Sequence, residues 1–124
     1  MAIHRASATN EATVVVYLND FRDSMLGFDP TTAQLHPATR FSLPAPADAQ
    51  EMRAVLESIY LQLNVGGDIV TAAAYTERYR SEGNRSLSVG DVVVIGETAF
   101  AVARFGFDTV SSAALSTALA GASS

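Results

Sequence analysis

Residues 83–110 read GNRSLSVGDVVVIGETAFAVARFGFDTV, and this stretch decides the fold of the chain. The β-branched run at 92–95 and the alternating run at 99–104 are typical of strands, and the residues at 96–98 predict a hairpin turn between them. Gly90 offers the positive φ that a tight turn ahead of the first strand needs. We therefore expect this hairpin to be the scaffold onto which the other elements pack.

The second strand of this hairpin has two chemically different faces. Phe100 and Val102 point one way, and the alanines at 99, 101 and 103 point the other way. Small side chains on a sheet leave room for a helix to approach closely. We expect the helix predicted at 48–64 to pack against these alanines.

The segment at 48–64 has the strongest helical pattern in the chain. Asp48 followed three residues later by Glu51 resembles a capping box, and Gly66 and Gly67 end the segment. The apolar residues step by three and four along one side: Met52, Val55, Leu56, Ile59, Tyr60 and Leu63. This spacing predicts an amphipathic helix that covers one face of a sheet.

Two further strands are predicted ahead of this helix. The run TVVVYL at 13–18 is apolar on both faces, which favours a central strand covered on each side. The run at 34–43 contains Pro37, which confines it to an edge or splits it. Gly27 and Pro30 lie between the two runs and break any long element, so a loop with one helical turn is expected there.

Together these patterns predict an α+β domain. We expect a mainly antiparallel sheet of about three to five strands, with the amphipathic helix on one face and a second, weaker helix at 68–83. The domain is placed at 13–110, between a flexible N-terminal tail at 1–12 and an Ala/Ser-rich C-terminal tail at 111–124. Leu115 and Leu119 in that tail are spaced for no more than a marginal helix.

The composition excludes several kinds of chemistry. The chain has 124 residues and no Cys, which excludes disulfides, thiolate nucleophiles and Cys-ligated zinc. The two His have no spaced partner, so neither a metal nor a cofactor is expected. A formal net charge of −5 disfavours binding to phosphate backbones, and nucleic acid is therefore not the expected partner.

The N-terminus carries no targeting pattern. The sequence MAIHRASATNEA lacks the apolar core of about 7 to 15 residues that a secretory signal requires. No run approaches the roughly 18 apolar residues of a membrane span. We expect a cytoplasmic protein with no membrane partner, located in the host cytoplasm if a phage encodes it.

One basic cluster supports an alternative function. Arg78, Arg80 and Arg85 lie close to Tyr75 and Tyr79 in the sequence. Arginine combined with aromatic residues is the chemistry of many grooves for single-stranded nucleic acid, so a nucleic-acid-associated regulatory role is one alternative. Two glutamates interrupt this charge, which favours an ordinary helix surface with local ion pairs.

Three blocks of the chain resemble a known family. They are LESIYLQLNV at 56–65, GNRSLSVGDV at 83–92 and Phe-Gly-Phe at 105–107, and they are similar to the YodL-like domain of plasmids, phages and conjugative elements. The middle block looks like the family's Ser-Leu-Ser-Val-x-Asp core, and Gly90 is typical of its actinobacterial members. The resemblance covers 56–110 and implies a mobile-element context, but no established reaction.

The middle block also invites a catalytic interpretation. Ser86, Ser88 and Asp91 could belong to a nucleophilic site, but no His accompanies them, and such a nucleophile needs a base within hydrogen-bond reach. A structural turn, in which the serine hydroxyls and the Asp91 carboxylate bond backbone amides, explains the same residues. We therefore expect no enzyme, and keep a small enzyme using His36 or paired carboxylates as an alternative.

The function we expect is that of a non-enzymatic accessory protein of a phage or other mobile element. It would act by binding a protein, for example one of the host, and a self-associating module is a further alternative. The working surface is expected beside the hairpin. The candidate partner-binding residues are Tyr75, Arg78, Tyr79, Arg80, Arg85, Phe105 and Phe107.

Overall fold

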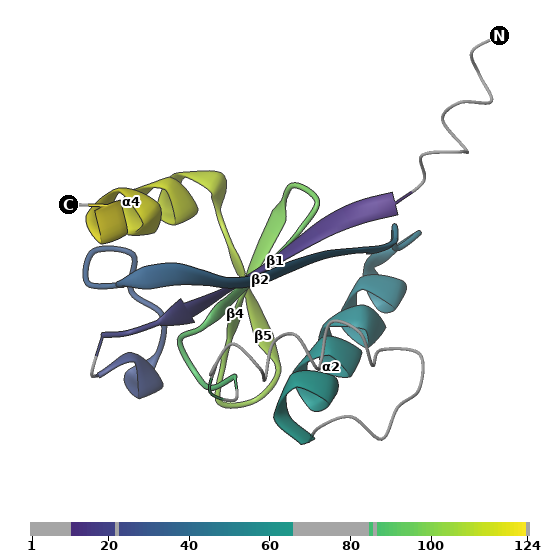
Figure 1. Ribbon diagram of the computed structural model, residues 1–124, viewed down its shortest axis with the longest axis horizontal. Helices are drawn as coiled ribbons and strands as arrows, with labels where there is room; N and C mark the ends of the chain where they lie inside the picture. Colours follow the sequence, from purple (N-terminus) through teal and green to yellow (C-terminus); the bar gives the residue numbers. More distant parts are fainter. Residues whose placement is uncertain (1–10, 22, 66–84, 86, 124) are drawn as a thin grey trace, which may run out of the picture.

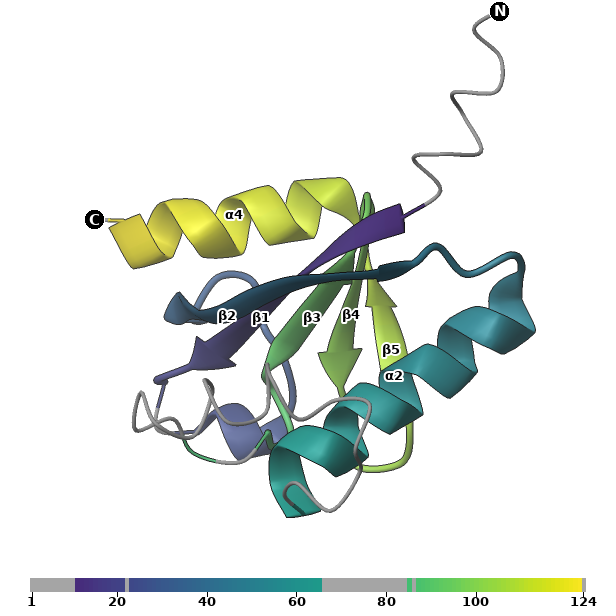
Figure 2. The ribbon, with the colours of Figure 1, turned by 45° about the vertical axis from the view of Figure 1, so that its right-hand side comes forward.

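The computed structural model describes residues 11–21, 23–65, 85 and 87–123. The elements in chain order are β1 (Glu11–Asn19), the 3₁₀ helix η1 (Ser24–Leu26), β2 (Leu35–Pro44), α2 (Ala49–Val65), β3 (Val92–Ile95), β4 (Thr98–Val102), β5 (Phe107–Val110) and α4 (Ser112–Ser123). Figure 1 shows these elements coloured along the chain, and the strands form one antiparallel sheet in the order β2-β1-β3-β4-β5, as labelled in Figure 2. This confirms the predicted α+β fold.

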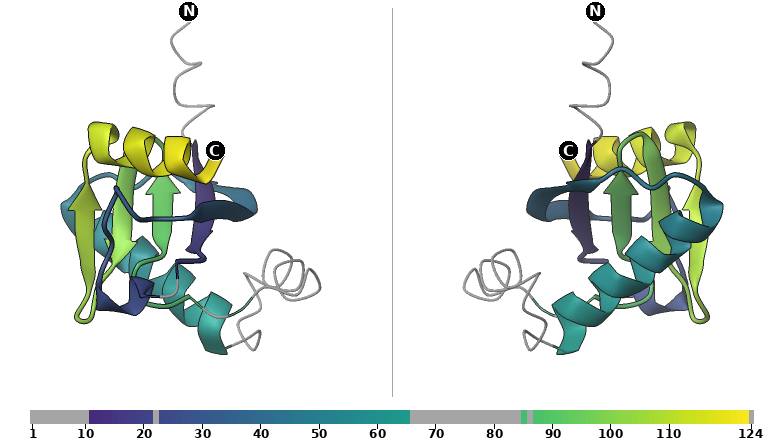
Figure 3. Two further views of the ribbon diagram at one scale, coloured as in Figure 1. Left: turned by 90° about the vertical axis from the view of Figure 1, so that its left-hand side faces the viewer. Right: turned by 90° about the vertical axis from the view of Figure 1, so that its right-hand side faces the viewer.

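The two helices lie on opposite faces of the sheet, with α4 above it and α2 below it in Figure 2. On one face, Leu56, Ile59 and Leu63 of α2 pack with buried residues of β1 and β3. On the other face, Ala118 of α4 is fully buried with residues of β3, β4 and β5. The described chain therefore has three layers, and Figure 3 shows the sheet from its two faces, with α4 in front in the left view and α2 in front in the right view.

Strand β1 lies between β2 and β3, which confirms the central strand predicted from its apolar faces. Its residues Val14 and Val16 are fully buried. Strand β2 forms one edge of the sheet, as Pro37 predicted. The pairing of the two strands shifts register between Val16 and Tyr17, and Pro37 is the residue opposite Tyr17. A proline has no amide hydrogen, and an irregularity at an edge accommodates it.

The predicted hairpin is formed by β3 and β4. Ile95 pairs with Thr98 across a two-residue turn, and Gly96 at the first position of that turn has φ 64°. A glycine with positive φ at this position is the pattern of a type II′ hairpin turn. Strand β4 ends at Val102, two residues before the predicted end.

Helix α2 begins as the capping pattern predicted. The Asp48 side chain accepts a hydrogen bond from the Glu51 amide at 2.9 Å. The Glu51 carboxylate reaches back to the amide of Ala47, at 2.7 Å, one residue before the position of an ideal capping box. The first contact satisfies an amide that the first helical turn would otherwise leave without an acceptor, and the second ties the residue before the cap to the helix.

The helix that packs against the alanine face is α4, so the predicted packing of α2 on this face is wrong. Ala99 and Ala101 belong to the cluster around Ala118 of α4, whereas Phe100 on the opposite face packs with the α2 cluster. The large apolar side chains of α2 fill the space above the larger side chains of the sheet. The small side chains of α4 instead fit closely against the strand alanines. Sequence periodicity alone could not assign either helix to a particular face of the sheet.

The C-terminal segment predicted as a tail forms helix α4 over 12 residues. Its weak amphipathic pattern understates its stability, because most helical stability comes from tertiary packing rather than from the isolated segment. The weaker helix predicted at 68–83 lies outside the described residues.

The N-terminal strand is longer than predicted. Strand β1 begins at Glu11, so two residues of the predicted tail at 1–12 belong to the sheet, and the other ten lie outside the described residues. No helix in the described part of the chain is long and apolar enough to cross a membrane.

Candidate functional site

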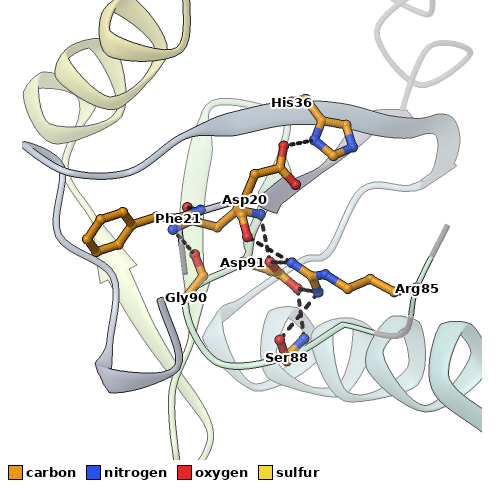
Figure 4. A network of polar contacts seen from close by, with 8 residues as sticks. Asp20, Phe21, His36, Arg85, Ser88, Gly90 and Asp91 are labelled. Carbon is orange, nitrogen blue, oxygen red and sulfur yellow. Dashed lines mark hydrogen bonds and ion pairs between the residues drawn. The ribbon is translucent and has the colours of Figure 1, made fainter. Parts of the chain in front are cut away.

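Asp91 is the centre of a buried polar network at one end of the sheet (Figure 4). Its side chain is 0% exposed. Oδ1 accepts hydrogen bonds from the Asn19 amide at 2.8 Å and from Arg85 Nη2 at 2.8 Å. Oδ2 accepts from the Ser88 amide at 2.7 Å and from Arg85 Nη1 at 2.7 Å. The two guanidinium contacts make a bidentate ion pair, the strongest form of charge-assisted hydrogen bonding between these side chains.

Asn19 connects this network to the loop between β1 and β2. Its side-chain amide donates to the Gly90 carbonyl at 3.0 Å, and its side-chain oxygen accepts from the amides of Phe21 and Gln34. Its backbone carbonyl accepts from Arg85 Nη2 at 3.0 Å. The end of β1, the loop that follows it and the turn before β3 are therefore held together by one asparagine.

The turn that presents Asp91 depends on glycine. The Asp91 amide donates to the Ser88 carbonyl at 3.0 Å, and Gly90 inside this turn has φ 96°, as the sequence predicted. A Cβ atom at Gly90 would lie 2.5 Å from the backbone oxygen of Ser24 in η1. The turn can therefore pack against η1 only when residue 90 has no side chain.

These contacts confirm that Asp91 bonds backbone amides in a structural turn. Each of its oxygens already accepts two hydrogen bonds, so it has little capacity left to bind a substrate. The Ser88 hydroxyl lies 3.3 Å from Arg85 Nη1, and Ser86 lies outside the described residues. The sequence did not predict the role of Asn19, because Asn19 lies 72 residues from Asp91 in the chain. It did not predict the role of Arg85, because Arg85 lies on a segment without a repeating pattern.

A second polar pair lies beside this network. His36 Nδ1 is 2.7 Å from Asp20 Oδ2, and both side chains are about half exposed. The sequence showed no partner for His36, because the two residues lie on β2 and on the loop after β1 and meet only through the pairing of those strands. Within the described part of the chain, no group of three or more His, Asp or Glu side chains could hold a metal ion.

Asp29 organises the loop that follows η1. Its carboxylate accepts hydrogen bonds from the hydroxyl and the amide of Thr31, at 2.7 and 2.9 Å. These hydrogen bonds, the one from the hydroxyl first, lower the pKa of Asp29. The charged form of Asp29 thus supports the turn that leads toward β2.

Apolar side chains are exposed around the turn between β4 and β5. Phe105 in this turn is 87% exposed, and Leu26 of η1 is 82% exposed. On the α2 side, Leu61 and Tyr60 are also exposed, and the Tyr60 ring meets the Phe107 ring edge-on with centroids 6.2 Å apart. We call Leu26, Tyr60, Leu61, Phe105 and Phe107 the hairpin-end surface, because they lie around the turn of the β4–β5 hairpin.

Two clefts flank the turn between β4 and β5, which we call the hairpin end. Leu26 and Phe28 line a cleft of about 540 Å³ together with the end of β4, β5 and the start of α4. Tyr60 and Leu61 line a second cleft of about 380 Å³ on the α2 side. Arg104 borders both clefts. The hairpin end is thus an exposed aromatic ridge between two hollows.

The structure places three of the seven predicted partner-binding residues. Phe105 and Phe107 belong to the hairpin-end surface, and the Arg85 guanidinium is bonded to Asp91 and Asn19. The other four, Tyr75, Arg78, Tyr79 and Arg80, lie outside the described residues. The sequence did not predict Leu26, Tyr60 or Leu61 on this surface. A single apolar residue in a loop or in a helical stripe resembles a core residue, and Tyr60 was assigned to the stripe that covers the sheet.

Comparisons with models of known protein families, with curated proteins and with solved structures found no match to the chain. The resemblance to the YodL-like domain therefore stays a prediction based on the three sequence blocks.

Proposed function

We propose that the chain is a non-enzymatic accessory protein that binds another protein through the hairpin-end surface. The observation that carries this proposal is the exposure of Phe105 between two clefts lined by Leu26 and Tyr60. Aromatic side chains that enter a partner's pocket supply much of the energy of protein interfaces. Grouped apolar exposure of this kind is a feature of interaction surfaces.

Two observations support binding rather than catalysis. The Asp91 carboxylate is saturated by internal donors, and a group that serves a reaction needs free capacity toward a substrate. The His36–Asp20 pair does not line either of the clefts beside the hairpin end. The engagement of Arg85 with Asp91 also removes one of the three cations on which the nucleic-acid alternative depends.

The cellular role proposed is that of an accessory protein of a phage or other mobile element, acting on a protein of the host or of the element. This part of the proposal rests on the resemblance of 56–65 and 83–92 to the YodL-like domain. An acidic chain of this size can act by occupying the surface of a partner, and its net charge of −5 keeps it soluble while it does so.

Photo-crosslinking tests the proposal directly. A benzophenone amino acid is placed at position 105, or as a control at position 97 in the β3–β4 turn, which is also exposed. Crosslinking is performed in the cells that carry the gene, and the products are identified by mass spectrometry. We expect a protein that crosslinks from 105 and not from 97.

A matched variant completes the test. Once the crosslinked protein is purified, Phe105→Ala should weaken its binding by about tenfold or more, as truncation of an aromatic anchor does. Glu97→Ala should leave the affinity unchanged. Equal affinity of the two variants, or identical crosslinks from both positions, would show that the hairpin end is not the binding surface.

A further inference from the structure

Strand β5 forms the edge of the sheet beside the hairpin end (Figure 3). The direction of its backbone groups follows from β4. The Val102 amide donates to the Asp91 carbonyl and the Val102 carbonyl accepts from the Gly90 amide, so both groups of Val102 point toward β3. Backbone groups alternate in direction along an antiparallel strand, and those of Ala101 and Ala103 therefore point toward β5.

The contact at the turn agrees with this alternation. The Ala103 amide donates to the Gly106 carbonyl at 3.0 Å, so the backbone of Asp108, two residues further on, also points toward β4. Phe107 and Thr109 occupy the alternate positions, and their N–H and C=O groups point away from the sheet. Among the described residues, these four groups have no backbone partner. These groups can form the hydrogen bonds of one further strand at the edge of the sheet.

The two edges of the sheet differ in protection. Strand β2 carries Pro37, Arg40 and a register shift, all of which hinder the addition of another strand. Strand β5 has no proline and no basic residue. Pairing with an added strand is therefore hindered at β2 and open at β5.

Hollows lie on both faces of the sheet beside β5. On the α4 side, Val110 and Ala114 line the cleft of about 540 Å³. On the α2 side, Phe107, Thr109 and Met52 line a further cleft of about 210 Å³. Side chains of a strand alternate between faces, so a segment paired with β5 would direct successive side chains toward these two clefts.

We propose that the partner contributes an extended segment that pairs with the edge of β5 and continues the sheet. In such strand addition, main-chain hydrogen bonds supply affinity, and clefts that take alternate side chains supply specificity. Phe105 lies at the end of this row of main-chain hydrogen bonds and contacts the same partner. The inference rests on the proposed function and specifies the way in which the partner binds.

Local charge indicates the chemistry of the segment. On the α2 side, Arg53 lines the cleft of about 210 Å³ and Arg104 borders the cleft of about 380 Å³, so both arginines can be reached from one face of an added strand. Neither guanidinium forms an ion pair with another residue that the structure describes. We therefore assign a segment in which apolar residues alternate with Asp or Glu, so that its carboxylates face these two arginines.

A second copy of this chain fits the edge less well. The strand that a second copy would place here is β5 itself, Phe-Asp-Thr-Val, which has one carboxylate and does not alternate apolar with acidic residues. Antiparallel self-pairing centred on Asp108 would also place two identical carboxylates opposite one another, which destabilises a strand pair.

The test uses two pools of short synthetic peptides, in which Val or Leu alternates with Glu in one pool and with Lys in the other. Binding to the full chain is measured by fluorescence anisotropy. Thr109→Pro removes an amide that points away from the sheet, and an edge strand tolerates proline there. Thr109→Ala keeps the amide and is the matched control.

We expect the Glu pool to bind Thr109→Pro about tenfold more weakly than Thr109→Ala, because both variants lack the threonine side chain and only the proline loses ladder hydrogen bonds. Arg53→Ala should weaken binding of the Glu pool by about threefold, the effect of one exposed ion pair. Equal binding to Thr109→Pro and Thr109→Ala would overturn strand addition. Equal or tighter binding of the Lys pool would overturn the assignment of an acidic segment.

Hydrogen exchange of the wild type keeps the test independent of how well the proline variant folds. The Glu pool should slow exchange of the Phe107 and Thr109 amides and leave the Glu97 amide unchanged. Unchanged exchange at 107 and 109 under saturating peptide would overturn the proposal. A dimer in sedimentation that Thr109→Pro abolishes would identify a second copy as the occupant and would also overturn it.

The two proposals can fail separately. If crosslinking from position 105 persists in Thr109→Pro at the wild-type level, strand addition is wrong and binding by the hairpin-end surface stands. If no protein crosslinks specifically from position 105, while the Glu pool binds β5 as expected, the hairpin-end surface is not the binding site.

Discussion

Replacing Asp91 by alanine should strongly destabilise the chain. The substitution removes the acceptor for two backbone amides, those of Asn19 and Ser88, and for the Arg85 guanidinium. A buried donor left without an acceptor costs about 1–3 kcal/mol. The Arg85 side chain is 42% exposed and can return to water, so it adds little. The Asn19 amide is buried and the Ser88 amide is partly buried, so the two together predict a loss of about 3 kcal/mol, a large share of the 5–15 kcal/mol that holds a typical domain folded.

The assay is urea unfolding followed by far-UV circular dichroism, with the free energy of unfolding extrapolated to water. Asp23→Ala is the matched control, because the Asp23 side chain makes no capping hydrogen bond to η1, and it should change stability by less than about 0.5 kcal/mol. A loss below about 1 kcal/mol for Asp91→Ala would refute the reasoning, since it would mean that the amides find other acceptors.

A double-mutant cycle measures the interaction free energy between Asp91 and Arg85. Arg85→Ala leaves the Asp91 carboxylate buried with two amide donors, and should also be destabilising. The double variant should lose less stability than the sum of the two single variants, because each removes the same ion pair. Additive losses would contradict a direct interaction between the two side chains.

Three further perturbations have defined outcomes. Gly90→Ala should cost about 2 kcal/mol or more, because a Cβ would meet the Ser24 carbonyl and φ is positive; urea unfolding measures this. Ala118→Leu should cost about 1–3 kcal/mol in the same assay, because Ala118 is fully buried between α4 and the sheet. Thr31→Val should raise the pKa of Asp29 toward that of a free aspartate, in an NMR titration. Because the pKa of Asp29 is lowered in the folded chain, its contribution to stability is present above the unfolded pKa and is lost as the pH falls through the folded value.

Each of these has a control. Gly96→Ala meets only a Cβ at 3.9 Å, so it should cost less than Gly90→Ala. Ala113→Leu lies on the exposed side of α4 and should be nearly neutral. Thr31→Ser keeps the hydroxyl donor, so the pKa of Asp29 should stay lowered in that variant. Equal losses at the two glycines, or at the two alanines, would contradict the packing described for Gly90 and Ala118.

Local pattern was enough to predict most of the elements. The apolar run at 13–18, the proline in the second strand and the three- and four-residue spacing of 48–64 each reflect a rule that acts within one element. The positive φ of Gly90 could be predicted for the same reason, because it follows from the chemistry of a short turn.

The hairpin-end surface was predicted in part. Phe105 and Phe107 stand out in the sequence as two aromatics around a glycine. The tertiary structure decides which of the two is exposed. Phe107 packs against Tyr60 of α2, whereas Phe105 has no such neighbour within the turn. Leu26 joins the same surface only because the loop after β1 folds beside the end of β4.

The sequence by itself determined strands β1 to β4 and helix α2, and that the strands have two faces. The tertiary structure alone decided which helix covers which face, and it turned a weakly amphipathic Ala/Ser segment into α4 by burying Ala118 against the strand alanines. It also decided that Asp91 binds Asn19, 72 residues away in the chain. The periodicity of a segment shows which of its faces is apolar and which is polar. Contacts between residues distant in sequence depend instead on close packing and on an acceptor for every buried hydrogen-bond donor.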